Sequence, residues 1–354
     1  MNFPNWQREN WVDFPNNPVV GYWGEGQPHA AIGDPQVLIP GEFDGKWHMF
    51  YHGFYDGSYT PYFHHIVSDD GYNWEMLYKL QWNVNPVNLF HDKGIWYVYY
   101  SAVIAHGTSE REKYSSVNII RVRQSKDLKS WSEATDILVP ELDWEKEFDP
   151  SQPGLIEARN PCMVKIGEKY RLYYSAGTVK LHDCGYEEPK YIGFAEADTP
   201  TGPFTKNPSP IIAPDKNIPY RNYGAGAIKV FGSGDGFIGL YNSIYTDSDG
   251  CSRSAINLIK SRDGISWEEA PFNPIIIPAD EYACDKSKEN VMWKRTLVYQ
   301  LDIVRWHDEF RIYYNAREGT ADGIEKIGCS VIKDTSTDLH KLWDIPPVFL
   351  PHSK

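Results

Sequence analysis

The chain has 354 residues and a formal net charge of −13, from 35 Lys and Arg against 48 Asp and Glu. Nucleic-acid affinity comes from clustered cations, and the sequence has no Lys/Arg-rich run, so its composition argues against a nucleic-acid partner. Aromatic residues make up 15% of the chain, which suits both sheet packing and the stacking of sugar rings.

The sequence also bears on location and cofactors. Apolar runs such as 274–278 are far shorter than the roughly 20 residues of a membrane helix, and residues 1–17 lack the apolar core of a signal peptide. We therefore expect a cytoplasmic protein without a membrane partner. The 5 Cys are scattered without a Cys-x-x-Cys pair, which favours buried reduced thiols and no metal site.

A set of three phrases recurs along the chain. The first unit reads Gly-Asp-Pro-Gln-Val-Leu at 33–38, then Lys-Trp-His-Met-Phe-Tyr-His-Gly at 46–53, then Ser-Asp-Asp-Gly-Tyr-Asn-Trp at 68–74. The second unit repeats the pattern with Asn-Pro-Val at 85–87, Trp-Tyr-Val-Tyr-Tyr-Ser at 96–101 and Ser-Lys-Asp-Leu-Lys-Ser-Trp at 125–131. The aromatic runs separated by Asp-Gly turns are typical of β-hairpins.

Three further units follow, so the opening phrases begin near residues 34, 85, 160, 226 and 300. The third unit opens with Asn-Pro-Cys, and the fourth closes with Ser-Arg-Asp-Gly-Ile-Ser-Trp at 261–267. The fifth is looser, with Gln-Leu-Asp at 300–302. We assign the Trp of the closing phrases to packing between units.

Repeated four-stranded units without helical periodicity predict an all-β, five-bladed β-propeller, which protects its strand edges by closing a ring. We treat residues 1–354 as a single domain. Proline-bracketed phrases that join the blades recur at 17–20 and 346–351, so the termini are expected to meet and close the ring. An independent N-terminal arm is the alternative.

These blade phrases resemble the five-bladed propeller glycosidases: glycoside hydrolase family 43 and the related families 32, 68, 117 and 130. The resemblance covers roughly residues 18 to 350. It implies a glycosidase whose carboxylates come from the inner strands of different blades. Cleaving an acetal requires a proton for the leaving oxygen and a nucleophile or activated water on the opposite face of the sugar.

Asp34 and Glu157 are the candidate catalytic pair. Asp34 matches the blade-one Asp-Pro phrase that supplies the base or nucleophile in this superfamily, and a turn-capping Asp is the alternative. The Ile-Glu-Ala phrase at 156–158 resembles the one that supplies the general acid in family 43. It departs from that family because Arg159 and Asn160 intervene before the proline, and Glu157 in a loop salt bridge is the alternative.

The superfamily usually has a third carboxylate, whose place is harder to assign. Asn85 and Asn160 occupy two suitable positions as amides, which leaves Asp302 on the inner strand of blade five as a candidate. Without a third acid, a variant mechanism or a non-catalytic sugar binder would follow.

A neutral sugar also needs stacking surfaces and hydrogen-bonding groups. The candidates for substrate binding are expected in loops or strand ends around the funnel, namely Trp23, His29, His52, Asn85, Arg159, Asn160, Tyr223, Arg295 and Arg317. Packing between blades is the alternative for the aromatic members. No cofactor is expected, and a structural ion at the propeller axis cannot be read from the sequence.

Together these features predict a glycoside hydrolase, exo-acting and inverting, on a small neutral oligosaccharide such as an arabinoside, xyloside or fructoside. Insertions at 105–116 and 179–190 are expected to rim the funnel and to favour short substrates. A phosphorylase of the family 130 type is an alternative, with Arg159, Arg221, Arg295 and Arg317 as candidate phosphate ligands. A sugar-binding propeller without chemistry is another. The sequence does not indicate an oligomeric state.

Overall fold

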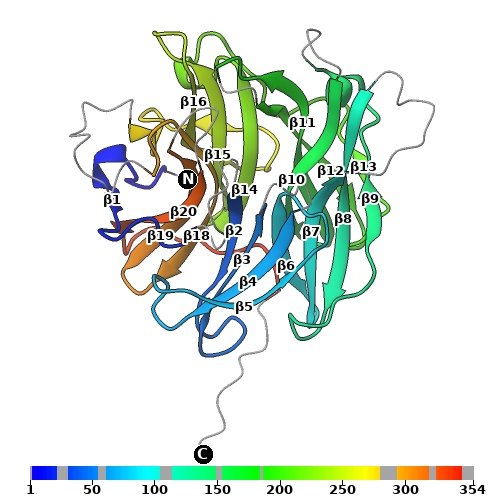
Figure 1. The fold of residues 1–354 in the computed structure, drawn as a ribbon, viewed down its shortest axis with the longest axis vertical. Coiled ribbons are helices and arrows are strands. Elements are labelled where there is room, and N and C mark those ends of the chain that lie inside the picture. The colour runs from blue at the N-terminus through cyan, green and yellow to red at the C-terminus, as the bar shows by residue number, and fades with distance from the viewer. Residues whose placement is uncertain are drawn as a thin grey trace, which may run out of the picture.

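The computed structural model describes residues 2–21, 31–54, 61–103, 114–148, 154–183, 186–279, 293–318 and 324–344. These residues form five four-stranded blades around a common axis (Figure 1), and parallel pairing of residues 114–118 with 154–157 joins the second and third blades into one eight-stranded sheet. The prediction of an all-β five-bladed propeller is therefore confirmed. The helices within the described residues are single 3-10 turns at Arg8–Asn10, Asp143–Lys146 and Pro219–Arg221.

Each of the first four blades is a run of four consecutive strands. The first contains β2 (Ile32–Leu38), β3 (Trp47–Gly53), β4 (Tyr62–Ser68) and β5 (Glu75–Leu80). The second contains β6 (Val87–Asp92), β7 (Ile95–Val103), β8 (Tyr114–Ser125) and β9 (Thr135–Leu138). The third contains β10 (Gly154–Ile166), β11 (Lys169–Lys180), β12 (Glu187–Ala197) and β13 (Thr205–Lys206). The fourth contains β14 (Gly224–Ser233), β15 (Gly236–Thr246), β16 (Ser252–Ser261) and β17 (Glu268–Glu269).

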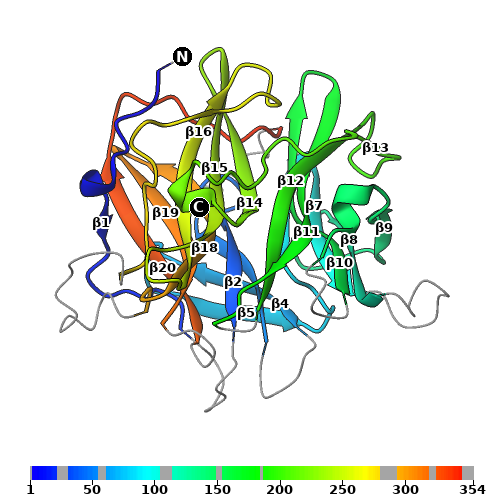
Figure 2. The ribbon, with the colours of Figure 1, turned by 90° about the horizontal axis from the view of Figure 1, so that it is seen from above.

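The fifth blade takes its outer strand from the other end of the chain. It contains β18 (Leu297–Trp306), β19 (Glu309–Arg317) and β20 (Glu325–Lys333), and β1 (Val12–Asp13) pairs antiparallel with β20. Figure 2 shows the N-terminal segment beside β20. Residues 346–351, expected to meet this segment, lie outside the described residues.

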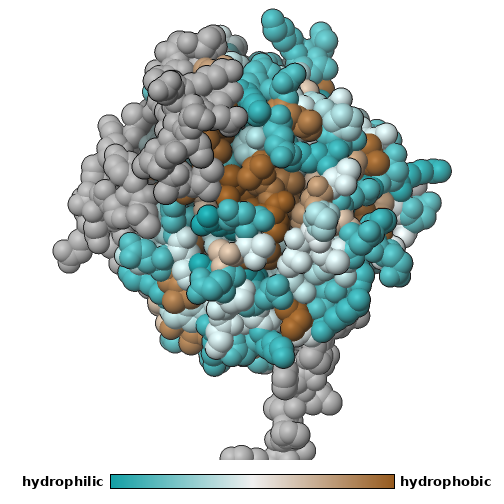
Figure 3. All heavy atoms as spheres, turned by 90° about the vertical axis from the view of Figure 1, so that its right-hand side faces the viewer, coloured by the Kyte–Doolittle hydropathy of each residue, from teal (hydrophilic) through white to brown (hydrophobic). Residues whose placement is uncertain are grey.

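Aromatic residues join neighbouring blades. The hydroxyl groups of Tyr99, Tyr173 and Tyr313, on the second strands of blades two, three and five, donate to main-chain oxygens of the turn after the third strand of the next blade, at Pro200, Gly264 and Gly71. The repeated aromatic phrases therefore hold the blades together. The outer face over blades two and three is largely hydrophilic, with apolar residues gathered near its centre (Figure 3).

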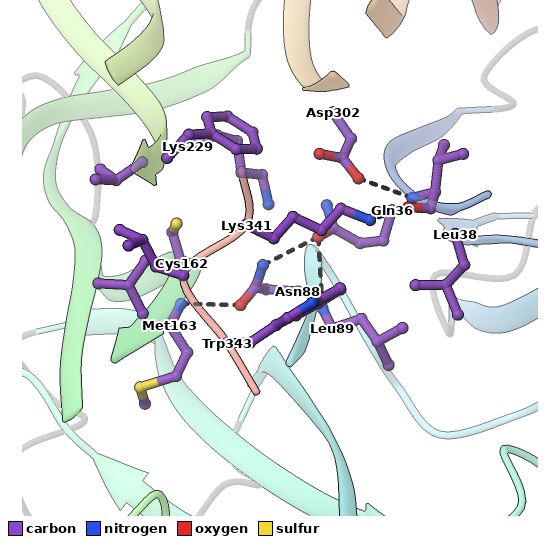
Figure 4. Close-up of a pocket in the computed structure, with 15 residues that line it drawn as sticks. Gln36, Leu38, Asn88, Leu89, Cys162, Met163, Lys229, Asp302, Lys341 and Trp343 are labelled. Carbon is purple, nitrogen blue, oxygen red and sulfur yellow. Dashed lines mark hydrogen bonds between the residues drawn. The ribbon is translucent and has the colours of Figure 1, made fainter. Parts of the chain in front are cut away.

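A second set of contacts follows the axis itself. One inner-strand residue of each blade contributes to what we call the axial ring: Gln36, Asn88, Cys162, Lys229 and Asp302. Gln36 Oε1 accepts a hydrogen bond from the main-chain N–H of Leu89, and Asn88 Oδ1 accepts one from Met163 (Figure 4).

The ring continues around the remaining blades. Val230 donates its N–H to the Cys162 thiol, and Asp302 Oδ2 accepts from the N–H of Val37 at 2.8 Å. A lysine cannot accept a hydrogen bond, so Lys229 cannot serve the N–H of Ile303. Asp302 Oδ1 accepts that N–H instead, at 2.9 Å.

Asp302 therefore closes the ring between blades five and one. It lines a small cavity of about 30 Å³ on the axis, which the C-terminal residues Lys341 and Trp343 also line. Its interpretation as a third catalytic carboxylate does not fit this position, because both carboxylate oxygens accept main-chain hydrogen bonds.

We expect Asp302→Ala to lower the free energy of unfolding by about 1.5–3 kcal/mol, because two buried N–H groups lose a charged acceptor. Chemical denaturation measures this loss. Asp69→Ala is the control, since Asp69 is an exposed partner of Lys46 and such pairs contribute little. Equal stability of both variants would contradict the closing role of Asp302.

Candidate active site

A cavity of about 420 Å³ is lined by residues of blades one to five. Its charged lining, together with one histidine, consists of Asp34, His52, Arg159, Glu187, Glu188, Arg317 and Glu325. Amide side chains line it as well, namely Asn85, Asn160, Asn242, Gln300 and Asn315. Aromatic surfaces come from Phe54, Tyr186 and Tyr299.

Bulges in the inner strands bring these side chains to the cavity. In β2, β10, β14 and β18, two residues stand opposite one residue of the second strand, between Gly33 and Gln36 in the first case. A bulge bends its strand and redirects a side chain. Bulged residues of each of these strands line the cavity, namely Asp34, Asn160 and Gly226 of the first three and both Tyr299 and Gln300 of β18.

The backbone at two of these positions explains the residue types. Asp34 and Asn160 have φ angles of 59° and 56°, in the left-handed region that Asp and Asn tolerate better than most residues. Such backbone strain concentrates at functional sites. Asn160 is an amide at the position of Asp34, and its Oδ1 accepts from Gln300 Nε2 at 2.6 Å.

Asp34 is buried, with a side-chain exposure of 5%. His52 Nδ1 lies directly against Asp34 Oδ2, and the Asp34 main-chain N–H donates to Asn315 Oδ1 at 3.3 Å. Asn315 Nδ2 in turn donates to Glu325 at 3.0 Å. The carboxylate of Asp34 is thus held by His52 on β3, and its main chain is held by Asn315 on β19 of blade five.

Arg159 connects two glutamates. Its Nε lies 3.0 Å from Glu157 Oε1 and its Nη2 lies 3.2 Å from Glu188 Oε2. Burial raises the pKa of Glu157 to about 7, although Arg159 opposes the shift. Burial likewise raises the pKa of Glu188 to about 7, against the opposing effect of Arg159.

The two glutamates differ in access to the cavity. The Glu157 side chain is 0% exposed, and Glu157 is absent from the described lining of the cavity. Glu188 lines the cavity and its side chain is 14% exposed. The predicted acid at 157 is therefore next to the site through Arg159, whereas Glu188 faces it.

Arg317 forms a second charge pair at the cavity. Its Nη1 lies 3.1 Å from Glu325 Oε1, and its guanidinium stacks 4.1 Å from the centre of the Tyr186 ring. Burial raises the pKa of Glu325, and Arg317 opposes the shift. Each cavity arginine is therefore already paired with at least one carboxylate.

The structure separates the predicted binding residues into groups. His52, Asn85, Arg159, Asn160 and Arg317 all line the cavity. Tyr223 does not: its hydroxyl donates to the Lys180 main-chain oxygen. Arg295 is exposed and is not part of the described lining. Trp23 and His29 lie outside the described residues.

Sequence reasoning missed Glu187, Glu188 and Glu325. Glu187 and Glu188 begin β12, the third strand of blade three, within the insertion at 179–190 that was expected to rim the funnel. The two adjacent acids before Pro189 were the available signal.

Within the described residues, no group of three or more His, Cys, Asp or Glu is arranged to hold a metal ion. No helix among them is long and apolar enough to span a membrane.

Known proteins that are similar to this chain are glycoside hydrolases. Residues 85–218 match the sequence profile of Glycosyl hydrolases family 43. The chain resembles the structure of a thermostable family-43 glycoside hydrolase with a TM-score of 0.52 and 22% identity, over 68% of this chain and 75% of that one. No curated protein matches the sequence.

Two other solved structures cover nearly the whole chain. A glycosyl hydrolase from Bacteroides ovatus has a TM-score of 0.60 and 14% identity, over 97% of this chain and 99% of that one. A family 117 glycoside hydrolase produced by Zobellia galactanivorans has a TM-score of 0.56 and 16% identity, over 92% and 91%. The profile match and the fold together place the chain in the family 43-like superfamily of propeller glycosidases.

The buried glutamates predict a pH dependence of stability. Their pKa is about 7 in the folded protein against 4.5 for the free group, so between these values the native state binds more protons and the free energy of unfolding falls as pH rises. The buried His64 and His65, with pKa lowered by burial to about 3 and about 2, act oppositely below 6.5. The histidine effect therefore fades above pH 6.5, and a variant of one glutamate is needed to separate its contribution.

We expect the melting temperature of the wild type to fall between pH 6.5 and 8, and that of Glu188→Gln to fall less, because the amide cannot ionise. Differential scanning calorimetry at both pH values measures the change. An identical decline in the two proteins would show that Glu188 does not ionise in this range.

Proposed function

We propose that this glycosidase is an exo-acting, inverting glycoside hydrolase that cleaves a small neutral oligosaccharide, a pentoside or hexoside, in the cavity around Asp34. The observation that carries this proposal is the buried carboxylate of Asp34. It lies in a strained bulge beside His52 and faces a cavity that Glu188 of blade three and Glu325 of blade five also line. Asp34 is the general base that activates water.

The charge balance of the cavity favours a neutral substrate. Arg159 and Arg317 are both paired with carboxylates, so binding a phosphate there would require breaking a buried pair, which is costly. Of the other arginines considered for phosphate, Arg221 lies 3.5 Å from Glu269, and Arg295 is exposed. These contacts favour hydrolysis over phosphorolysis.

The shape of the site supports exo action. The inner strands converge below the cavity in the axial ring, and the C-terminal segment crosses beneath it, where Lys341 Nζ donates to the Val37 main-chain oxygen. The described lining therefore forms a pocket that ends at the axis. A pocket accepts one end of a short chain, and the amides and Tyr186 line the place of the terminal sugar.

Asp34→Asn is expected to reduce turnover by about 10²–10⁴-fold, the usual contribution of a general base. The assay uses a panel of aryl arabinosides, xylosides, galactosides and fructosides together with natural disaccharides. Asp69→Asn, at an exposed position, is the matched control. A wild type that turns over nothing in the panel, or an Asp34→Asn variant with full activity, would contradict the proposal.

The stereochemistry of the first product tests inversion. The mechanism requires a water between the Asp34 carboxylate of blade one and a carboxyl group contributed by blade three, the blade on which Glu157 and Glu188 lie. Inverting enzymes place these groups about 6.5–9.5 Å apart. Proton NMR of the first-formed anomer is expected to show inverted configuration, and retained configuration would refute this mechanism.

A further inference from the structure

Glu157, Arg159 and Glu188 form a buried cluster of two carboxyl groups and one guanidinium. Both carboxyl groups contact Arg159, at 3.0 Å and 3.2 Å. If both ionised, the cluster would have one uncompensated negative charge. An uncompensated charge has a high free-energy cost when it is buried. The cluster therefore favours the state in which one of the two carboxyl groups is protonated and the other is ionised.

The contacts of the two carboxyl groups indicate which of them can deliver a proton to a bound sugar. Glu157 Oε1 pairs with Arg159, and its Oε2 accepts from Asn118 Nδ2 at 3.4 Å. Burial and the charge of Glu187 disfavour its ionised form, whereas these two contacts favour it. It is fully buried, so a sugar in the cavity has no contact with it.

Glu188 differs from Glu157 in its access to the cavity and in its charged neighbours. It lies at the cavity, where Glu325 from β20 and Glu157 from β10 disfavour its ionisation, while Arg159 and a hydrogen bond with Tyr299 favour it. Glu187 precedes it on β12 and also lines the cavity. Glu188 is therefore the member of the cluster that can hold a proton where a leaving oxygen would lie.

We propose that Glu188 is the general acid of this glycosidase, and that Glu157 and Arg159 are positioning residues that keep it protonated. The proton passes from the Glu188 carboxyl group to the oxygen of the leaving sugar as the bond from that oxygen to the anomeric carbon breaks. Water attacks the anomeric carbon and gives its proton to Asp34. This assignment rests on the proposed hydrolase function and replaces Glu157 as the acid.

Leaving-group dependence tests the assignment. Glu188→Gln is expected to lose about 10²–10⁴-fold on substrates with poor leaving groups, such as natural disaccharides. It should lose far less on dinitrophenyl glycosides, which depart without a proton. Glu196→Gln is the matched control, because Glu196 lies on the same strand but pairs with Arg171 outside the cavity, and both substrate classes should react as in the wild type.

Glu157→Gln is expected to change the pH profile of kcat/KM and to leave the leaving-group dependence unchanged. Without the charge of Glu157, Arg159 pairs with Glu188 alone and lowers its pKa, so the alkaline limb of the kcat/KM profile should move to lower pH while the leaving-group dependence stays that of the wild type. In Glu188→Gln this limb should vanish. If Glu157→Gln instead shows the selective loss on poor leaving groups, or Glu188→Gln loses equally on both classes, the assignment is wrong.

A titration without substrate separates this inference from the proposed function. In protein labelled with ¹³C at glutamate carboxyl groups, the resonance missing from Glu188→Gln should titrate near pH 7 in the wild type and at lower pH in Glu157→Gln. A wild-type Glu188 resonance that titrates near 4.5 would overturn the inference whatever the substrate. A failure to hydrolyse any glycoside, with this titration as expected, would refute only the proposed function.

Discussion

The structure depends on how the inner strands are joined around the axis. Each blade alone is a small sheet, and its inner edge would leave main-chain N–H groups buried and unpaired. Side chains of the axial ring accept these groups from the next blade, as Gln36 does for Leu89 and Asn88 for Met163. Where Lys229 interrupts the series, Asp302 accepts two N–H groups and joins the last blade to the first.

The same strands build the cavity at their other end. A bulge in the inner strand separates the residues that close the axis from those that face the cavity, so Gln300 lines the cavity whereas Asp302, two residues further along β18, lines the axial cavity. The axial ring holds the bulge of β2 in place, and the bulge sets the position of the Asp34 carboxylate. Charge then affects the protonation of the site, because its two arginines are outnumbered by the carboxyl groups around them.

The sequence predicted the repeat well because every blade repeats the same hairpin chemistry, and the Asp-Pro phrase located Asp34. It could not separate Gln300 from Asp302, since both are polar residues on one strand and only the bulge places Gln300 at the cavity and Asp302 in the axial ring. It also selected Glu157 and missed Glu188. Glu157 resembles a family phrase, whereas the importance of Glu188 arises from its contact with Arg159 on another strand, which no local pattern reveals.

The central claim is that one sugar binds between Asp34 and Glu188 with its glycosidic bond placed for attack by water. A crystal structure of Asp34→Asn with an oligosaccharide it cannot cleave tests this most directly. The account predicts the glycosidic oxygen within hydrogen-bonding reach of Glu188, about 2.6–3.2 Å, and a water between residue 34 and the anomeric carbon. A sugar bound elsewhere, or one whose glycosidic oxygen points away from Glu188, would contradict it.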